Sequence, residues 1–317
     1  MLDTALGVRP TVALSGGVVA ERLGVDITWI VEVFQETGSF KYRAASSLVA
    51  TVPQRQILAA SSGNFGQALA AACRRLGKQA IVLMPAQSAR VKIEAVRYWG
   101  GKVVFVDTTV MSRAARLAEL AEEYPDAYVA SAYDDWHVIR GNASLGREIA
   151  ELLEFDAVVV PIGGGGLASG IALGLREKGS RARLWGAEPL LANDAARSLR
   201  EGRRVLLEKE PPTLADGART LGLGEKNWEI LRGELSGILE VPETAIAEAV
   251  RLLFRECNLK VEPTGALAVA AVVENSERFR DQKVAVVLTG GNVDPGLYAR
   301  LIEEPTFVRE EKSSKEA

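Results

Sequence analysis

The sequence predicts an α/β protein built on parallel β-sheets. Short apolar runs rich in valine and isoleucine recur along the chain, which is typical of strands buried on both faces. Segments with helical periodicity separate these runs and imply parallel crossovers. Several runs end directly in loops rich in glycine, serine or asparagine, and such loops are where α/β proteins bind ligands.

The pattern predicts each element in chain order. The predicted strands are Ile27–Val31, Ile57–Ala60, Ala80–Met84, Val103–Val106, Ala127–Ser131, Val158–Ile162, Leu184–Ala187 and Val284–Leu288. The predicted helices are Gly66–Leu76, Arg90–Trp99, Ser112–Glu123, Ser144–Leu153, Leu167–Lys178, Glu243–Cys257 and Gly265–Asn275. The Pro- and Gly-rich segment Pro211–Gly224 is predicted to be a loop.

Composition excludes several classes of protein. The 317 residues carry 38 Lys and Arg against 41 Asp and Glu, a net charge of −3, which argues against nucleic-acid binding. No apolar run approaches the ~18 residues of a membrane span, so no membrane association is expected. The two cysteines, Cys73 and Cys257, lack metal-type spacing and suit a reducing cytoplasm, where we expect the protein. The single histidine, His137, excludes a His-rich metal centre.

Two junctions between a strand and a helix carry side chains suited to chemistry. Lys41 lies between two aromatic residues after a Gly-Ser turn, and apolar surroundings would favour its neutral, nucleophilic amine. Taken alone, a solvated lysine at a helix start explains it more simply. Ser62 and Asn64 follow a predicted strand and could bind a small polar ligand or cap the next helix.

Two further junctions follow later strands. The four glycines Gly163–Gly166 precede a helix, so that converging backbone N–H groups and the helix dipole would hold a phosphate. The same loop also fits a dinucleotide fingerprint, with Glu188 about 20 residues further on. Thr289 presents a hydroxyl at the end of a strand, where it could bind a ligand or only open a turn.

Carboxylates also follow one strand. Glu188 and Asp194, with a backbone carbonyl between them, could bind a hard cation such as Mg²⁺ or Ca²⁺ through oxygen atoms. Two solvated acids are the simpler interpretation of the spacing alone. The segment Lys260–Gly265 opens a helix of small residues, with Thr264 as the expected N-cap.

Together, these motifs resemble the fold-type-II pyridoxal-phosphate enzymes, specifically the branch of serine racemases and serine/threonine dehydratases (threonine ammonia-lyases). The resemblance extends from Thr28 to Asp294 and rests on the order and spacing of seven motifs. The motifs are GSFKYR, SSGNFGQAL, PIGGGGLASG, EPxxAND, ADG at Ala215–Gly217, VEPTGA and LTGGNVD.

The resemblance implies a role for each matching position. Lys41 is expected to form the Schiff base with pyridoxal 5'-phosphate, Phe40 to pack near the ring, and Asn64 to hydrogen-bond the phenolic oxygen. Gly163, Gly164, Gly165 and Gly166 match the phosphate loop. Thr289 matches the residue that faces the pyridine nitrogen, and Ser62 the serine on the face opposite the lysine. Glu188, the carbonyl of Ala192 and Asp194 match the divalent-cation site.

The resemblance also implies the architecture and the reaction. Two open parallel-sheet domains like those of the tryptophan synthase β-subunit should hold the cofactor in the cleft between them. Residues 1–45 and 134–317 would form the large domain and residues 46–133 a small inserted domain. The expected reaction is β-elimination from L-serine, L-threonine or a related β-hydroxy amino acid to a 2-keto acid and ammonia. A homodimer acting on a small amino acid is expected.

Other functions remain open from the sequence. Within the family, these are an amino-acid racemase, using Ser62, and a dehydratase of a bulkier β-hydroxy amino acid. From another class, an NAD-dependent oxidoreductase would use Gly163 to Glu188 but leave Lys41, Asn64 and Thr289 unexplained.

Three positions bear on the substrate. Phe65 stands where the family has histidine, and it predicts a less polar pocket that disfavours acidic substrates. Gly141-Asn142-Ala143-Ser144 replaces the usual Gly-Gln-Gly-Thr. His137 is expected in a surface loop rather than in the pocket.

Overall fold

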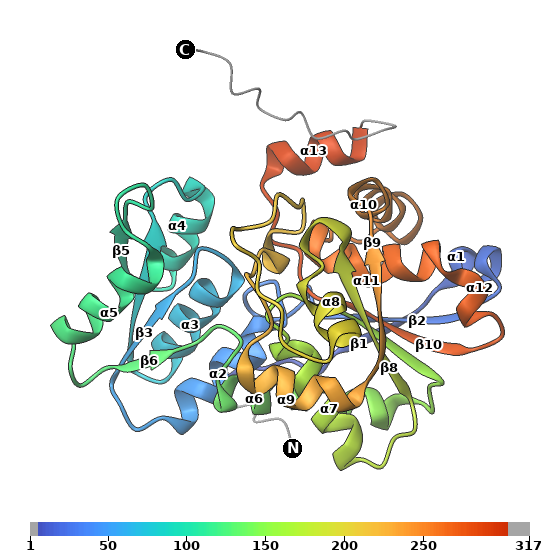
Figure 1. Cartoon of the computed structure of the whole chain (residues 1–317), viewed down its shortest axis with the longest axis horizontal. Helices are drawn as coiled ribbons and strands as arrows, with labels where there is room; N and C mark the ends of the chain where they lie inside the picture. The colour runs from blue at the N-terminus through green and yellow to red at the C-terminus, as the bar shows by residue number, and fades with distance from the viewer. Residues whose placement is uncertain (1–5, 304–317) are drawn as a thin grey trace.

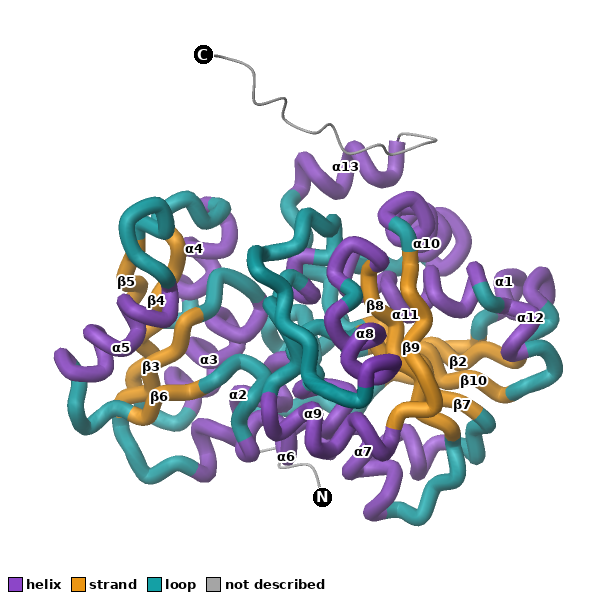
Figure 2. Tube along the Cα trace, in the orientation of Figure 1, coloured by secondary structure: helices purple, strands orange, loops and turns teal. Residues whose placement is uncertain are grey.

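The computed structural model describes residues 6–303 and contains two separate β-sheets (Figures 1 and 2). The first is six-stranded, in the order β1-β2-β10-β7-β8-β9, and only the β1–β2 pair is antiparallel. Its strands are β1 (Val12–Ser15), β2 (Asp26–Val31), β7 (Ala157–Pro161), β8 (Arg183–Pro189), β9 (Leu235–Val241) and β10 (Lys283–Leu288).

The second sheet is four-stranded and parallel, in the order β5-β4-β3-β6. It is formed entirely by residues 56–130, within the range in which the small domain is predicted. Its strands are β3 (Gln56–Ala60), β4 (Gln79–Pro85), β5 (Lys102–Val106) and β6 (Tyr128–Ala130). The predicted α/β class with parallel sheets is therefore confirmed.

Helices connect and cover the strands. The α-helices are α1 (Gly17–Leu23), α2 (Lys41–Thr51), α3 (Asn64–Arg75), α4 (Arg90–Tyr98), α5 (Arg113–Glu123), α6 (Trp136–Leu152), α7 (Gly166–Glu177), α8 (Asp194–Glu201), α9 (Glu225–Glu234), α10 (Glu243–Cys257), α11 (Pro263–Glu274), α12 (Ser276–Phe279) and α13 (Pro295–Glu303). Short 3-10 turns are η2 (Leu190–Ala192) and η3 (Asp216–Ala218). No helix in the range 6–303 is long and apolar enough to cross a membrane.

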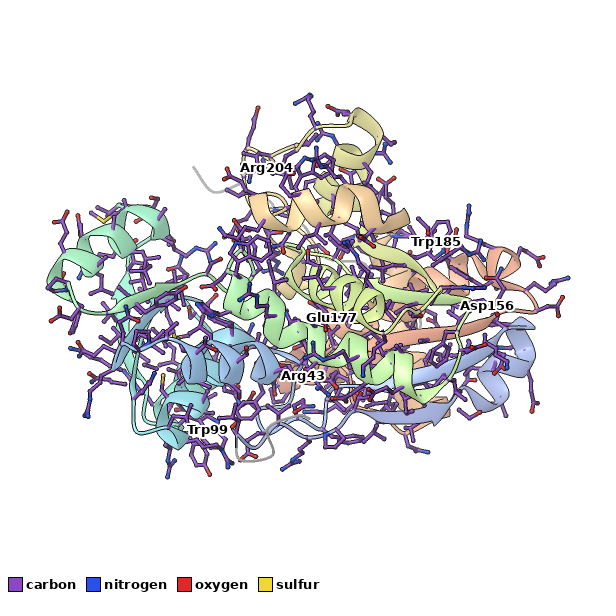
Figure 3. All side chains as sticks on the ribbon, turned by 90° about the horizontal axis from the view of Figure 1, so that it is seen from below. Arg43, Trp99, Asp156, Glu177, Trp185 and Arg204 are labelled. Atoms are coloured by element: carbon purple, nitrogen blue, oxygen red, sulfur yellow. The ribbon has the colours of Figure 1, made fainter. Side chains whose placement is uncertain are left out.

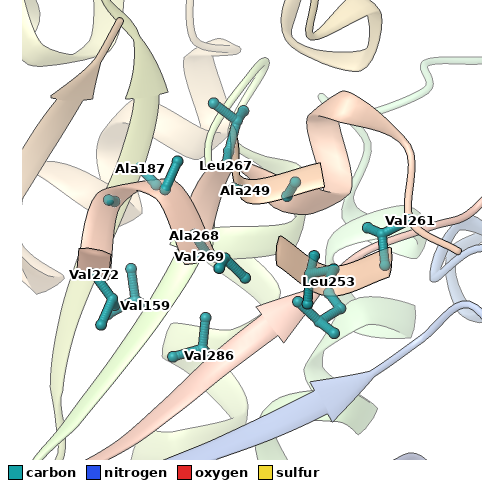
Figure 4. Close-up of a cluster of buried hydrophobic side chains, with 14 of the residues drawn as sticks. Val159, Ala187, Ala249, Leu253, Val261, Leu267, Ala268, Val269, Val272 and Val286 are labelled. Carbon is teal, nitrogen blue, oxygen red and sulfur yellow. The ribbon is translucent and has the colours of Figure 1, made fainter. Parts of the chain in front are cut away.

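The inner strands of the six-stranded sheet are buried on both faces, and successive residues of each strand point to opposite sides. Val159 and Val286 pack in one cluster, with α10 and the apolar helix α11 (Figure 4). Val158 and Val287 pack in another cluster, on the side of α6 and α7. Two-sided burial explains why these strands read as continuous apolar runs in the sequence.

The two edge strands of the six-stranded sheet, β1 and β9, were not predicted. In β1 every residue is exposed, and in β9 the sequence LSGILEV includes serine and glycine. Neither strand therefore has the continuous apolar pattern on which the prediction depended.

Helix α6 begins at Trp136, eight residues before the predicted start at Ser144. Asp135 caps it, because its Oδ1 accepts a hydrogen bond of 2.8 Å from the backbone N–H of His137. His137 therefore lies in the first turn of a helix, and its expected loop position is wrong. Its ring meets that of Tyr128 edge to face at 6.0 Å.

A buried ion pair fixes the start of α2. The guanidinium of Arg43 lies 2.7 Å from Glu32, which follows β2, and 2.7 Å from Glu148 on α6. The side chains of Arg43 and Glu32 are fully buried. Figure 3 shows Arg43 near the middle of the molecule, beside α6. Lys41 therefore stands at the head of a helix that is anchored to the end of β2 and to α6.

Candidate active site

A cavity of about 460 Å³ lies where loops from both sheets meet. All four predicted junctions line it, although they are far apart in the sequence. The predicted site residues in its wall are Phe40, Lys41, Ser62, Asn64, Gly163, Gly164, Gly165, Gly166 and Thr289. Each follows the carboxyl end of a strand, as expected for a ligand site in an α/β protein.

Lys41 is the first residue of α2, and it lines the cavity. Two backbone contacts hold the preceding turn on the loop after β10: Phe40 N donates to the carbonyl of Thr289 at 3.0 Å, and Ser39 bridges Gly290. The Lys41 amine donates to the carbonyl of Ala132 at 2.7 Å. Burial among protein atoms lowers the pKa of Lys41 from 10.5 to about 8. The structure therefore excludes a freely solvated lysine.

Asn64 is held by two partners that the sequence analysis did not single out. Its Nδ2 donates to Oε1 of Glu262 at 2.7 Å, and its Oδ1 accepts from Asn292 Nδ2 at 2.9 Å. Burial, followed by the nearby charge of Asp216, raises the pKa of Glu262 to about 8. Both partners lie inside motifs on which the family resemblance rests, VEPTGA and LTGGNVD. The motifs could be recognised from the sequence, but the contacts of Glu262 and Asn292 with Asn64 could not.

The structure excludes the capping alternative for Ser62, Asn64 and Thr264. The N-cap of α3 is Gly63, and Ser61 rather than Ser62 or Asn64 accepts from the backbone of the first turn, at Gly66 N and 3.2 Å. Thr264 lies inside α11, where its Oγ1 accepts from Gly217 N at 2.9 Å. The hydroxyl of Ser62 and the amide of Asn64 are therefore not used for capping.

The glycine loop is shaped by close neighbours. A Cβ atom on Gly164 would overlap the ring of Tyr133, and Gly165 has a positive φ of +90°. Asn227 Nδ2 donates to the Gly164 carbonyl at 2.8 Å and fixes the turn. Because α7 begins at Gly166, which lines the cavity, the positive end of its dipole lies at the cavity wall. A cradle of this shape fits a phosphate group.

Glu188 and Asp194 lie apart from the cavity, at the end of β8 and the start of α8. Both are 1% exposed, so they are not solvated acids. Glu188 accepts from Ala195 N and Ala196 N, each at 2.9 Å. Burial and the charge of Asp194 raise the pKa of Glu188 well above its usual value. Because Glu188 caps α8, it is unavailable to a ribose, which removes the dinucleotide interpretation.

The same pair of acids leaves one oxygen unsatisfied. Asp194 Oδ2 is buried and has no hydrogen-bond partner within residues 6–303. Burial raises the pKa of Asp194 to about 7. No cluster of three or more His, Cys, Asp or Glu side chains occurs in that range, so a cation here would need backbone oxygen such as the Ala192 carbonyl. Two buried acids with an orphaned oxygen fit a cation of that kind.

Three further cationic side chains line the cavity, which together with an adjoining cavity forms a cleft, and the sequence analysis did not assign them to the site. Lys92 and Arg113 come from the small-sheet side, and Arg219 follows η3. All three also line an adjoining cavity of about 490 Å³, which includes Ser62. Phe65 is 2% exposed, with its ring 5.8 Å from the Lys41 amine. Phe65 therefore shares the cavity wall with charged and polar side chains, and its effect on substrate choice stays a prediction.

Comparison with known proteins agrees with this geometry. Residues 4–290 match the family model described as "Pyridoxal-phosphate dependent enzyme". The chain is 36% identical over 277 residues to an L-threo-3-hydroxyaspartate ammonia-lyase of Pseudomonas sp, which covers 86% of each protein. Among solved structures, a threonine deaminase of T.th. is 40% identical, with a TM-score of 0.85, over 90% of this chain and 94% of that one.

A maize serine racemase has a TM-score of 0.87 and 29% identity, over 92% of this chain and 91% of the other. These relatives share the fold, and the family match spans nearly the whole chain, including the lysine, asparagine and glycine loop of the cavity. The chain therefore belongs to the family of pyridoxal-phosphate-dependent enzymes of fold type II.

Proposed function

We propose that the protein eliminates water from L-serine, L-threonine or a related β-hydroxy amino acid, giving a 2-keto acid and ammonia. The observation that carries this proposal is the amine of Lys41, which is packed among protein atoms at the wall of the cavity with its pKa lowered to about 8. An amine with such a pKa can lose its proton near neutral pH and act as nucleophile and base.

Pyridoxal phosphate, when bound, supplies the electron sink for removing the Cα proton. Lys41 would hold the cofactor and then accept that proton on its amine. Asn64, fixed by Glu262 and Asn292, would hold the cofactor's phenolic oxygen, and the glycine loop its phosphate. Phe40 and Thr289 would contact its ring and its ring nitrogen. The β-hydroxyl group would then leave with a proton as water, and the resulting enamine would become an imine that water hydrolyses to the 2-keto acid and ammonia.

Racemisation is the second candidate, and the position of Ser62 favours it. Ser62 lines both the main cavity and the adjoining one. A hydroxyl on the side opposite Lys41 could exchange the same proton from the other face. The relative abundance of keto acid and inverted amino acid separates the two reactions.

We also propose a divalent cation, Mg²⁺ or Ca²⁺, at Glu188, the Ala192 carbonyl and Asp194. The unsatisfied Oδ2 of Asp194 and the raised pKa of both acids support it, because a cation would balance their buried charge. The cation would act on stability and on the position of α8, since neither acid lines the cavity.

A homodimer is proposed from the exposed edge of the large sheet. Strand β1 has no neighbour on one side within the described residues, and it exposes Val12 and Leu14 by 36% and 37%. Uncovered edge strands favour association. Light scattering on the purified protein measures the mass directly, and a monomer at micromolar concentration contradicts this proposal.

A reducing compartment is proposed from the thiols. Cys73 is buried, Cys257 is partly buried, and both are free. Free thiols of this kind suit the cytoplasm.

The reaction is tested with a panel of L- and D-β-hydroxy amino acids. Keto acid and ammonia formed from L-serine or L-threonine support elimination, and a chiral assay of the remaining amino acid detects racemisation. Absence of both products from the cofactor-loaded protein, across the panel, contradicts the proposed function.

A further inference from the structure

The charges that line the cleft are unevenly matched. Lys92 pairs with Asp216 and Arg113 pairs with Glu210, so each of these cations has an acidic partner. Arg219 forms no ion pair within residues 6–303. Beside Lys41, which stands at the proposed cofactor site, Arg219 is therefore the cation of the cleft whose charge no described acid balances.

Arg219 is also held in a fixed geometry. Its Nε and Nη2 both donate to the Thr213 carbonyl, at 2.9 and 2.7 Å. Nη1 makes no hydrogen bond with any described residue. An anchored guanidinium with a free donor is pre-organised to bind an anion, because little side-chain entropy is lost on binding.

We propose that Arg219 binds a carboxylate carried by the substrate's side chain, so that the enzyme prefers acidic β-hydroxy amino acids of the 3-hydroxyaspartate type. This inference rests on the proposed elimination reaction and names its substrate class. The predicted penalty of Phe65 does not oppose it, because Phe65 lies beside Lys41 and does not line the adjoining cavity that Arg219 lines.

The cofactor phosphate is the competing anion for Arg219. The glycine loop, residues 163–166, lines the main cavity but not the adjoining one. Arg219 lines both cavities, as Ser62 does. Arg219 therefore also faces the part of the cleft that the phosphate cradle does not line.

The first test is the ratio of kcat/KM for L-threo-3-hydroxyaspartate to kcat/KM for L-serine. We expect Arg219→Gln to lower this ratio by about tenfold or more, the usual effect of losing a hydrogen bond to a charged group. Arg219→Lys should retain most of it, although it also loses the paired bonds to Thr213. Arg232→Gln is the matched control, because Arg232 pairs with Glu229 on the exposed face of α9.

The outcomes separate this inference from the proposed function. Keto acid formation with an unchanged ratio in Arg219→Gln overturns the inference and leaves the elimination reaction standing. A larger fall of the ratio in Arg113→Gln than in Arg219→Gln shows that the carboxylate binds the other arginine and also overturns it. A weaker affinity for pyridoxal phosphate in Arg219→Gln, without a change in the ratio, assigns Arg219 to the phosphate instead.

A binding measurement does not depend on turnover. Succinate carries two carboxylates and butyrate only one, at the same chain length. We expect succinate to raise the melting temperature of the cofactor-loaded wild type more than butyrate does, and sodium chloride to reduce the difference. The difference should vanish in Arg219→Gln and persist in Arg219→Lys and Arg232→Gln. Equal effects of the two acids on wild type contradict the inference, even if no substrate is turned over.

Discussion

Asn64 and Glu262 are 198 residues apart in the sequence, yet the Asn64 amide donates to the Glu262 carboxyl group at 2.7 Å. Glu262 is 4% exposed, so the neutral form of its carboxyl group is favoured. Glu262 fixes the position of Asn64 Nδ2, and Asn292, which donates to Asn64 Oδ1, fixes the position of that oxygen. The amide is therefore oriented before any ligand binds, which lowers the entropic cost of binding one.

Replacing Glu262 with Gln should change how stability depends on pH in the cofactor-free protein. The pKa of Glu262 is raised from 4.5 to about 8, so the folded protein binds more protons than the unfolded chain between these values. Stability should therefore fall as pH rises from about 5 to 8, by up to a few kcal/mol. Glu262→Gln should flatten this slope. Urea unfolding at several pH values measures it.

Glu229→Gln serves as the control, because the side chain of Glu229 is 61% exposed on α9. Its slope should match that of wild type. If Glu262→Gln keeps the full wild-type slope, Glu262 is ionised in the folded protein.

Replacing Lys41 with Ala should abolish turnover while the fold survives. The lysine supplies the amine at the cavity wall, and removing a buried amine with a lowered pKa relieves a desolvation cost. Borohydride reduction followed by mass spectrometry should find the cofactor attached to residue 41 of wild type and absent from the variant. Lys260→Ala is the control, since Lys260 is exposed and precedes α11. Turnover by the Lys41→Ala protein would refute the assignment.

Mg²⁺ or Ca²⁺ should raise the melting temperature, and EDTA should lower it. Binding to the native state alone stabilises by about 2.7 kcal/mol at a hundredfold excess over Kd. Asp194→Ala should lose the effect, because Asp194 Oδ2 is the unsatisfied oxygen of the site. Glu277→Gln, at an exposed pair with Arg280, should respond as wild type does. A metal response that persists in Asp194→Ala places the cation elsewhere.

Gly164→Ala should weaken binding of pyridoxal phosphate and destabilise the fold. The added methyl group would overlap the Tyr133 ring, and overpacking of this kind costs about 1–3 kcal/mol. Fluorescence titration of the cofactor and urea unfolding measure the two effects. Gly233→Ala is the control, because a Cβ atom added there would have no neighbouring atom within 4 Å. Equal behaviour of the two variants shows that the loop tolerates a side chain.

The interior of both sheets was predictable because two-sided burial demands continuous apolar runs. The strands β7 and β10 are examples, and each matched its prediction to within one residue. The strands β1 and β9 were missed because β1 is exposed along its whole length and β9 contains serine and glycine, so neither has such a run. The start of α6 was missed because its cap, Asp135, follows Tyr133 and Asp134 without a periodic signal.

The sequence by itself determined the residues whose chemistry is local. Lys41, Asn64 and the glycines Gly163–Gly166 could be recognised because each lies in a short motif after a strand. Only the tertiary structure decided which distant groups surround them: Glu262 beside Asn64, and Arg219 in the cleft that Phe65 alone suggested was apolar. Spacing along the chain specifies a turn or a helix face, whereas the charge and burial at a site depend on segments that only folding brings together.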